Sequence, residues 1–201
     1  MQDTAKMATR VLIVDDHPVV LSGCRTLFAS DHSIRIDEAS DAKSGHRAYV
    51  SKRPDVTVID ISLPDVSGFE LMRRIRKDDP DAKIIMFSMN DDPAFVVRAV
   101  ELGAQGYVSK GDDPRILLKA VRKVAAGDNF ISPQLAEAVT FSGAAIKANP
   151  ASLMTPQRVA ECLAASGDQP AYVGAKVKAP AGADVETRLG IISAVAHLLN
   201  S

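Results

Sequence analysis

Cysteine and aromatic residues are scarce in this chain of 201 residues. It contains two cysteines and no tryptophan, and aromatic residues make up 4% of the sequence. Cys24 and Cys162 lie far apart, and neither belongs to a C-x-x-C pair or to a Cys/His spacing typical of zinc ligands. This argues against a disulfide scaffold and a structural zinc site. We therefore expect the protein in a reducing compartment, the cytoplasm.

The chain also lacks a strong net charge and a long apolar run. It has 24 Lys and Arg against 25 Asp and Glu, so its formal net charge of −1 creates no general attraction for nucleic acid or membranes. No segment approaches the roughly 18 continuous apolar residues that a membrane span needs, and the first ten residues contain no apolar signal core. We expect no membrane anchor, and any contact with a polyanion must be local.

Hydrophobic residues make up 46% of the chain, enough to fill the core of a medium domain and a smaller one. From residue 10 onward, short apolar or β-branched runs alternate with longer segments of helical period, which is typical of βα units around a parallel sheet. Strands are expected at 10–14, 34–39, 56–59, 83–87 and 106–108. Helices are expected at 18–29, 41–51, 68–77, 93–102 and 114–126. The pattern predicts an α/β fold with a five-stranded, doubly wound parallel sheet.

Proline and glycine mark the ends of these helices. Pro18, Pro93 and Pro114 fall just inside the expected starts, where a missing N–H costs little. Gly103 and Gly127 follow the last apolar turns and indicate the helix ends.

The composition of the sequence changes after the fifth expected helix. We therefore divide the chain into four expected parts. We expect a disordered N-terminus over 1–9, the sheet domain over 10–130, a linker helix and linker over 131–153, and a C-terminal region over 154–201. That last region is rich in alanine and poor in bulky apolar residues. It is therefore expected to be small and mainly α-helical, or partly disordered.

Polar side chains follow the expected strands of the sheet. Ligands bind beyond the carboxyl ends of parallel strands, where neighbouring loops converge. The residues at those ends are Asp15, Asp16, Asp60, Ser88 and Lys110. Carboxylates that are gathered this closely repel one another and recruit a hard cation with oxygen ligands, for which Mg²⁺ is best suited.

This arrangement predicts phosphoryl chemistry. Asp16 and Asp60 could bind Mg²⁺ directly and Asp15 through water, with a backbone carbonyl near Ser62 completing the ligands. The Asp60 carboxylate can then attack phosphorus to form an aspartyl phosphate. Lys110 would pair with the phosphoryl oxygens, and the Ser88 hydroxyl would add a hydrogen bond.

Each of these residues also has an ordinary structural interpretation. An Asp pair before a helix is commonly a cap with a neighbouring surface acid, and a single lysine after a strand is commonly solvated. The coincidence of five such residues at one sheet edge favours the metal and phosphoryl site. His17 is interpreted as surface structure at a helix start and is left outside the site.

The segments VLIVDDHP, VIDISLPDVSGFEL, IIMFS and GAQGYVSK, in this order and spacing, resemble the receiver domain of two-component response regulators. The resemblance covers about residues 9–130 and implies a flavodoxin-like fold. The last part, GAQGYVSKGDDPRILLKAVRKVAAGDNFISP, is most similar to the LuxR/FixJ (NarL-like) subfamily. The resemblance implies these roles by position: Asp60 phosphoacceptor, Asp15 and Asp16 metal-binding pair, Ser88 switch hydroxyl, Lys110 phosphate partner and Tyr107 switch aromatic.

The same resemblance implies a sensor histidine kinase as phosphoryl donor and a homodimer formed on phosphorylation. A receiver catalyses only its own phosphorylation and dephosphorylation, so we expect no enzyme in the wider sense. An aspartyl-phosphate hydrolase is disfavoured because those sites place a second Asp where Ser62 stands. No G-x-G-x-x-G or G-x-x-x-x-G-K-[ST] motif follows a strand, which disfavours a nucleotide-cofactor enzyme.

The sequence allows two interpretations of the output, that is, of what the protein acts on after phosphorylation. LMTPQR at 153–158 resembles the opening of a LuxR-type DNA-binding domain, but the following residues do not match its recognition helix. The region is thus a degenerate helix-turn-helix or a poorly folded tail, and no DNA-binding residue can be assigned. Transcriptional control through DNA is the first expectation. The alternative is a receiver that acts through protein contacts or as a phosphate sink.

Overall fold

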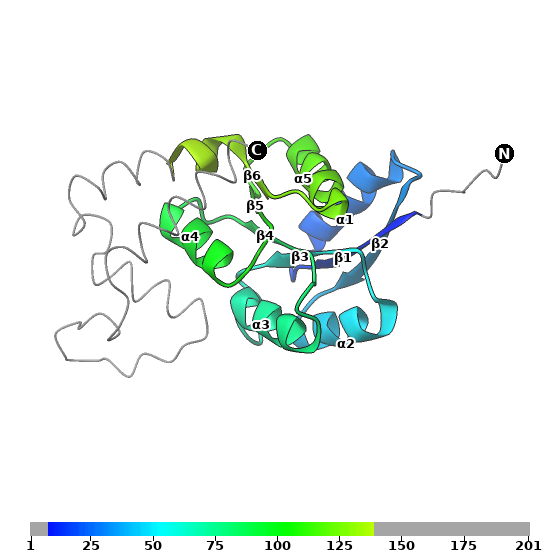
Figure 1. Cartoon of the computed structure of the whole chain (residues 1–201). Helices are drawn as coiled ribbons and strands as arrows, with labels where there is room; N and C mark the ends of the chain where they lie inside the picture. The colour runs from blue at the N-terminus through cyan, green and yellow to red at the C-terminus, as the bar shows by residue number, and fades with distance from the viewer. Residues whose placement is uncertain (1–7, 139–201) are drawn as a thin grey trace, which may run out of the picture.

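The computed structural model describes residues 8–138, which form a parallel sheet covered by helices on both faces (Figure 1). The strands are β1 (Thr9–Val14), β2 (Ile34–Ala39), β3 (Val56–Asp60), β4 (Ile84–Ser88), β5 (Gly106–Ser109) and β6 (Phe130–Ile131). Their order in the sheet is β2-β1-β3-β4-β5-β6, and all neighbours pair in parallel. The expected α/β fold is confirmed.

Five helices connect the strands: α1 (Pro18–Ala29), α2 (Ala42–Lys52), α3 (Gly68–Asp78), α4 (Pro93–Glu101) and α5 (Pro114–Ala126). Helices α1 and α5 cover one face of the sheet, whereas α2, α3 and α4 cover the other (Figure 1). Residues 133–138, after β6, are also helical. In the described part of the chain, no helix has the length and apolar character needed to cross a membrane.

The strands β1, β3 and β4 form the centre of the sheet and are buried. Every residue of β3 and β4 is buried, as are the last four residues of β1. Strands that are covered on both faces need apolar side chains on both faces. This is why their sequences are nearly continuous apolar runs rather than alternating ones.

The helix boundaries follow the local chemistry that the sequence predicted. Pro18, Pro93 and Pro114 each stand at the first positions of a helix. Gly127 caps α5 with φ 100°, and Gly103 follows the last residues of α4 with φ 92°. Both backbone conformations are left-handed and favour glycine because it has no Cβ. The expected helix ends are therefore confirmed.

The expected number of five strands is wrong, because β6 adds a sixth strand beside β5. The Phe130 N–H donates to the Gln105 carbonyl at 2.8 Å, and the Ser132 N–H donates to the Tyr107 carbonyl at 3.0 Å. A strand of two residues is too short to show alternation, so the sequence pattern gave no signal for it. Its pairing covers the backbone of β5, which would otherwise be an open edge.

Other boundaries differ by one residue. Asp41 was expected inside a helix, but it precedes α2 as its cap, and its carboxylate accepts a hydrogen bond from the Ser44 N–H at 2.7 Å. The expectations for residues 1–7, for the linker beyond residue 138 and for the C-terminal region at 154–201 lie outside the described residues.

We predict that Gly68→Ala destabilises the protein and disturbs the end of β3. A Cβ at Gly68 would lie 2.0 Å from the Asp60 carbonyl oxygen and 2.9 Å from a side-chain carbon of Ile59. Because backbone atoms cannot move cheaply, this overpacking should lower the free energy of unfolding by about 1 to 3 kcal/mol, measured by urea denaturation.

The matched control is Gly23→Ala in the exposed part of α1. A Cβ there meets no atom within 4 Å, and alanine should stabilise the helix by about 0.5 to 1 kcal/mol. Equal stability of the Gly68→Ala variant and the unmodified chain would show that the end of β3 tolerates this approach.

Candidate functional site

The carboxyl ends of β1, β3 and β5 meet at one edge of the sheet, and each supplies charged residues. Asp15 and Asp16 follow β1, Asp60 ends β3 and Lys110 follows β5. The structure brings these four side chains together, as the sequence predicted. We call them the acidic cluster.

Lys110 lies between two carboxylates of the cluster. Its Nζ atom is 2.7 Å from Asp15 Oδ2 and 2.8 Å from Asp60 Oδ2. All three side chains are almost completely buried, with exposed fractions of 6% for Lys110, 1% for Asp15 and 2% for Asp60. Water screens such charges poorly, so their attraction is much stronger than that of surface pairs. The Lys110 ammonium group is thus fixed directly beside Asp60.

Backbone contacts fix the orientation of Asp60 and Lys110. The Ser62 N–H donates to Asp60 Oδ1 at 3.2 Å, which leaves Asp60 Oδ2 facing Lys110. The Lys110 N–H donates to the Ser88 carbonyl at 2.7 Å and joins the ends of β5 and β4. Ser62 therefore lies beside Asp60, whereas the metal-binding role of its carbonyl stays a prediction.

His17 also reaches the acidic cluster, which the sequence interpretation missed. Its Nδ1 atom is 2.9 Å from Asp16 Oδ1, 3.1 Å from Asp15 Oδ1 and 3.8 Å from Asp60 Oδ2. The residue precedes α1, and its backbone N–H donates to Asp15 Oδ1 at 2.9 Å. The side chain is 58% exposed, so the interpretation as a surface residue was correct but incomplete. Its position directly after two aspartates was the available signal.

The three carboxylates of the acidic cluster and His17 together have the donors of a cation site. Asp15, Asp16, His17 and Asp60 each offer one ligand atom, and these four atoms lie within 4.8 Å of one another. Three of the donors are carboxylate oxygens, which hard divalent cations prefer. The cluster could therefore bind a metal ion.

Ser88 lies next to the cluster, and it shares one neighbour, Asn90, with Tyr107. Ser88 ends β4, is 2% exposed, and its Oγ accepts a hydrogen bond from the Asn90 N–H at 3.0 Å. The Tyr107 hydroxyl donates to the Asn90 carbonyl at 2.7 Å, and its ring is completely buried. The sequence predicted both Ser88 and Tyr107 as site residues. Asn90 was missed, because a single Asn in a loop has no distinctive pattern.

The buried thiol of Cys24 on α1 is unsuited to nucleophilic chemistry. Burial raises its pKa to about 11, and the nearby negative charge of Asp15 acts in the same direction. Since the thiolate is the reactive form, Cys24 is a packing residue at neutral pH.

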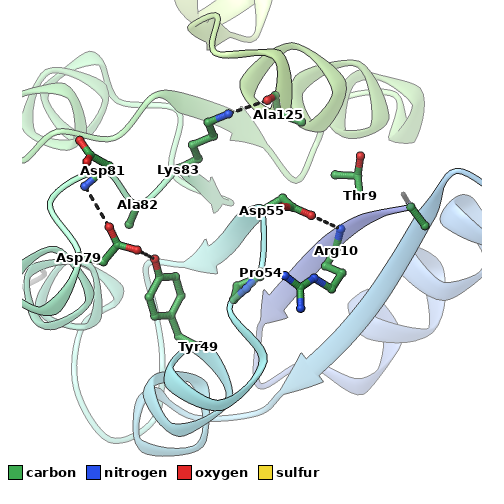
Figure 2. Close-up of a pocket in the computed structure, with 11 residues that line it drawn as sticks. Thr9, Arg10, Tyr49, Pro54, Asp55, Asp79, Asp81, Ala82, Lys83 and Ala125 are labelled. Carbon is green, nitrogen blue, oxygen red and sulfur yellow. Dashed lines mark hydrogen bonds between the residues drawn. The ribbon is translucent and has the colours of Figure 1, made fainter. Parts of the chain in front are cut away.

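A pocket lies at the opposite edge of the sheet, where β1 begins (Figure 2). Three of its charged side chains already have partners inside the protein. Asp55 accepts a hydrogen bond from the Arg10 N–H at 2.7 Å, Asp79 accepts one from the Tyr49 hydroxyl at 2.7 Å, and Lys83 donates to the Ala125 carbonyl at 2.6 Å. These contacts join the ends of neighbouring elements, and the pocket contains none of the expected site residues.

Comparison with known proteins assigns most of the described residues to one family. Residues 11–122 match the family model for the response regulator receiver domain. Residues 134–191 match a second model, which is described as a domain of unknown function (DUF4862).

Among curated proteins, the chain is similar to the methanol utilization control regulatory protein MoxX of Paracoccus denitrificans, with 36% identity over 129 residues. It is also similar to the response regulator GacA of Pseudomonas protegens, with 32% identity over 135 residues. The two matches cover 63% and 66% of this chain, and 58% and 62% of the relatives. The chain thus spans less than two thirds of their length.

Solved structures agree with this assignment. A LuxR-family two-component response regulator from Aurantimonas sp. SI85-9A1 is 39% identical with a TM-score of 0.62, and the match covers 65% of this chain and 94% of that one. The isolated REC domain of RcsB from Salmonella enterica serovar Typhimurium, solved with the phosphomimetic BeF3−, is 27% identical with a TM-score of 0.61. That match covers 65% of this chain and 97% of the REC domain. The receiver model covers more than half of the chain and includes the whole acidic cluster, so the chain belongs to the response regulator receiver domain family of two-component systems.

Proposed function

We propose that Asp60 accepts a phosphoryl group from a sensor histidine kinase in a Mg²⁺-dependent transfer. The observation that carries this proposal is the 2.8 Å contact between Lys110 Nζ and Asp60 Oδ2, at an edge where Asp15 and Asp16 also gather. These residues provide a nucleophile, a cation for the phosphoryl oxygens and donors for a metal ion. Phosphoryl transfer to a carboxylate needs these three components.

The charges of the acidic cluster support the choice of a divalent cation. Three carboxylates and one ammonium group leave two negative charges, which one divalent ion neutralises. Asp15, Asp16 and Asp60 would hold Mg²⁺ together with the Ser62 carbonyl, since Mg²⁺ prefers oxygen ligands. When bound, Mg²⁺ neutralises charge on the phosphoryl oxygens during the transfer.

In the transfer, a carboxylate oxygen of Asp60 forms a P–O bond while the P–N bond of the donor phosphohistidine breaks. The electron pair of the P–N bond stays on the histidine nitrogen, which takes a proton from solvent. Lys110 then pairs with the oxygens of the new phosphoryl group. Because its ammonium group already lies beside Asp60, little reorganisation is needed.

The contacts around Asn90 support a route from the phosphoryl group to the surface. If the Ser88 hydroxyl turns to donate to a phosphoryl oxygen, its hydrogen bond with the Asn90 N–H is exchanged for a charge-assisted one. Asn90 also holds the Tyr107 hydroxyl through its carbonyl. A shift of this loop would therefore change the position of Tyr107 and the adjacent face of α4, and thereby dimer formation.

In this proposal, the phosphorylated protein acts in the cytoplasm and controls transcription by binding DNA. It catalyses only its own phosphorylation and dephosphorylation. The similarity to a LuxR-family response regulator supports this output. A second candidate output acts through protein contacts or as a phosphate sink. It is kept beside the first because residues 134–191 match a domain of unknown function, which assigns no DNA-binding role to them.

We predict that Asp60→Asn abolishes labelling of the protein by radioactive acetyl phosphate in the presence of Mg²⁺. The amide removes the nucleophilic oxygen and keeps the size of the side chain. The control is Asp128→Asn, an exposed residue before β6, which should be labelled like the unmodified chain. Undiminished labelling of Asp60→Asn would place the acceptor elsewhere.

Lys110→Met should lower stability when divalent ions are removed, because Asp15 and Asp60 then remain buried without their cation. Loss of one partner from a buried ion pair costs about 3 to 5 kcal/mol. Urea denaturation in EDTA should show this loss, and excess Mg²⁺ should restore part of it by binding to the folded state. A loss that is the same with and without Mg²⁺ would disprove the shared role of lysine and metal.

A gel shift with the full chain separates the two outputs. With BeF3− and Mg²⁺, binding to DNA from its own promoter region should occur at lower protein concentration than without them. If the protein bound its promoter region no more strongly than unrelated DNA, transcriptional control would be rejected in favour of the second output, through protein contacts or as a phosphate sink.

A further inference from the structure

Beside the acidic cluster lies a nitrogen donor, His17 Nδ1, that an all-oxygen Mg²⁺ site does not need. His17 Nδ1 lies within 4 Å of one oxygen from each of the three carboxylates. Its place is fixed from two sides, since the residue stands directly before α1 and its backbone N–H donates to Asp15 Oδ1. The imidazole therefore belongs to the site by both side-chain and backbone contacts.

Two of the three distances match the spacing of neighbouring ligands around one metal ion. In an octahedral site with bonds of about 2.1 Å, neighbouring ligand atoms lie about 3.0 Å apart and opposite ones about 4.2 Å apart. The distances from Nδ1 to Asp15 Oδ1 and Asp16 Oδ1 are 3.1 Å and 2.9 Å, close to the spacing of neighbours. The distance to Asp60 Oδ2 is 3.8 Å, so this oxygen would shift by a few tenths of an ångström to become the ligand opposite Nδ1.

A hydrogen-bonding role alone explains these contacts less well. One N–H cannot point straight at both Asp15 Oδ1 and Asp16 Oδ1, although both lie at hydrogen-bond distance from Nδ1. A metal ion between the four donor atoms would use the Nδ1 lone pair and all three oxygens together. A further observation indicates a ligand here: Asp16 Oδ1 is buried and accepts no hydrogen bond, although it lies 2.9 Å from Nδ1.

We propose that His17 is a metal ligand through Nδ1, and that the site therefore binds nitrogen-preferring divalent ions such as Co²⁺, Ni²⁺ or Zn²⁺ more tightly than its carboxylates alone would. This inference rests on the proposed function, because it uses the same cation site. Imidazole adds little affinity for Mg²⁺, which prefers oxygen, and much more for later transition metals. His17 thus determines which metal ion occupies the phosphorylation site.

The test compares Co²⁺ and Mg²⁺ binding to the full chain and to His17→Ala by isothermal titration calorimetry. Co²⁺ binding at this site is identified as the part that excess Mg²⁺ displaces. His17→Ala should weaken that Co²⁺ binding by about tenfold or more and change the Kd for Mg²⁺ by less than about twofold. The side chain of His17 makes no cap hydrogen bond to α1, so the fold should survive. His32→Ala, an exposed histidine of the loop before β2, is the matched control and should change neither.

Proton NMR gives a second measurement, which distinguishes a metal ligand from a residue that only positions the carboxylates. Only a His17 bound to the ion would show a strongly shifted ring signal. In the Co²⁺-loaded chain, a ring C–H proton of a coordinated imidazole, which does not exchange with water, should be shifted far outside the normal range, and His17→Ala should lose this signal. An unchanged Co²⁺ affinity, an equal loss of Co²⁺ and Mg²⁺ affinity, or absence of the shifted signal would overturn the role of His17. If the unmodified chain bound neither ion, the proposed metal dependence of phosphorylation would fail as well.

Discussion

The ammonium group of Lys110 lies between two carboxylates that are hidden from water, and the rest of the site depends on this contact. Removal of each charge from water costs several kcal/mol, so Asp15 and Asp60 need a cation beside them. One lysine cannot neutralise them together with Asp16. The remaining negative charge favours a divalent ion at the same place, and in the proposed function that ion and Lys110 would then attract the oxygens of a phosphoryl group. His17 Nδ1 lies 2.9 Å from Asp16 Oδ1 on the same side.

The parallel sheet makes this contact possible because it brings distant parts of the chain to one edge. Asp15, Asp60 and Lys110 follow three different strands, and the buried core of β1, β3 and β4 holds those strand ends rigidly. Gly68 lets α3 begin directly against the Asp60 carbonyl. Ser88 and Tyr107 extend the site along β4 and β5 through Asn90. The fold therefore provides a charged centre and a hydrogen-bonded connection leading away from it.

Residue patterns were sufficient for the fold and the charged residues, and insufficient for features that depend on three-dimensional contacts. The apolar runs of the central strands and the prolines at the helix starts predicted most elements, because burial and backbone chemistry act locally there. Strand β6 was missed because two residues show no period. The contact of His17 with the cluster depends on how the chain turns after β1, and that of Asn90 on the path of the loop after β4. The position of His17 directly after two aspartates was a signal, but residue spacing alone determines neither path.

A crystal structure of the full chain with Mg²⁺ and BeF3− would test the central claim most directly. The account predicts BeF3− on the Asp60 carboxylate, a metal ion held by Asp15, Asp16 and Asp60, and Lys110 Nζ in contact with a fluorine atom. A structure with BeF3− at another residue, or with the three carboxylates turned away from a common ion and from Lys110, would contradict it.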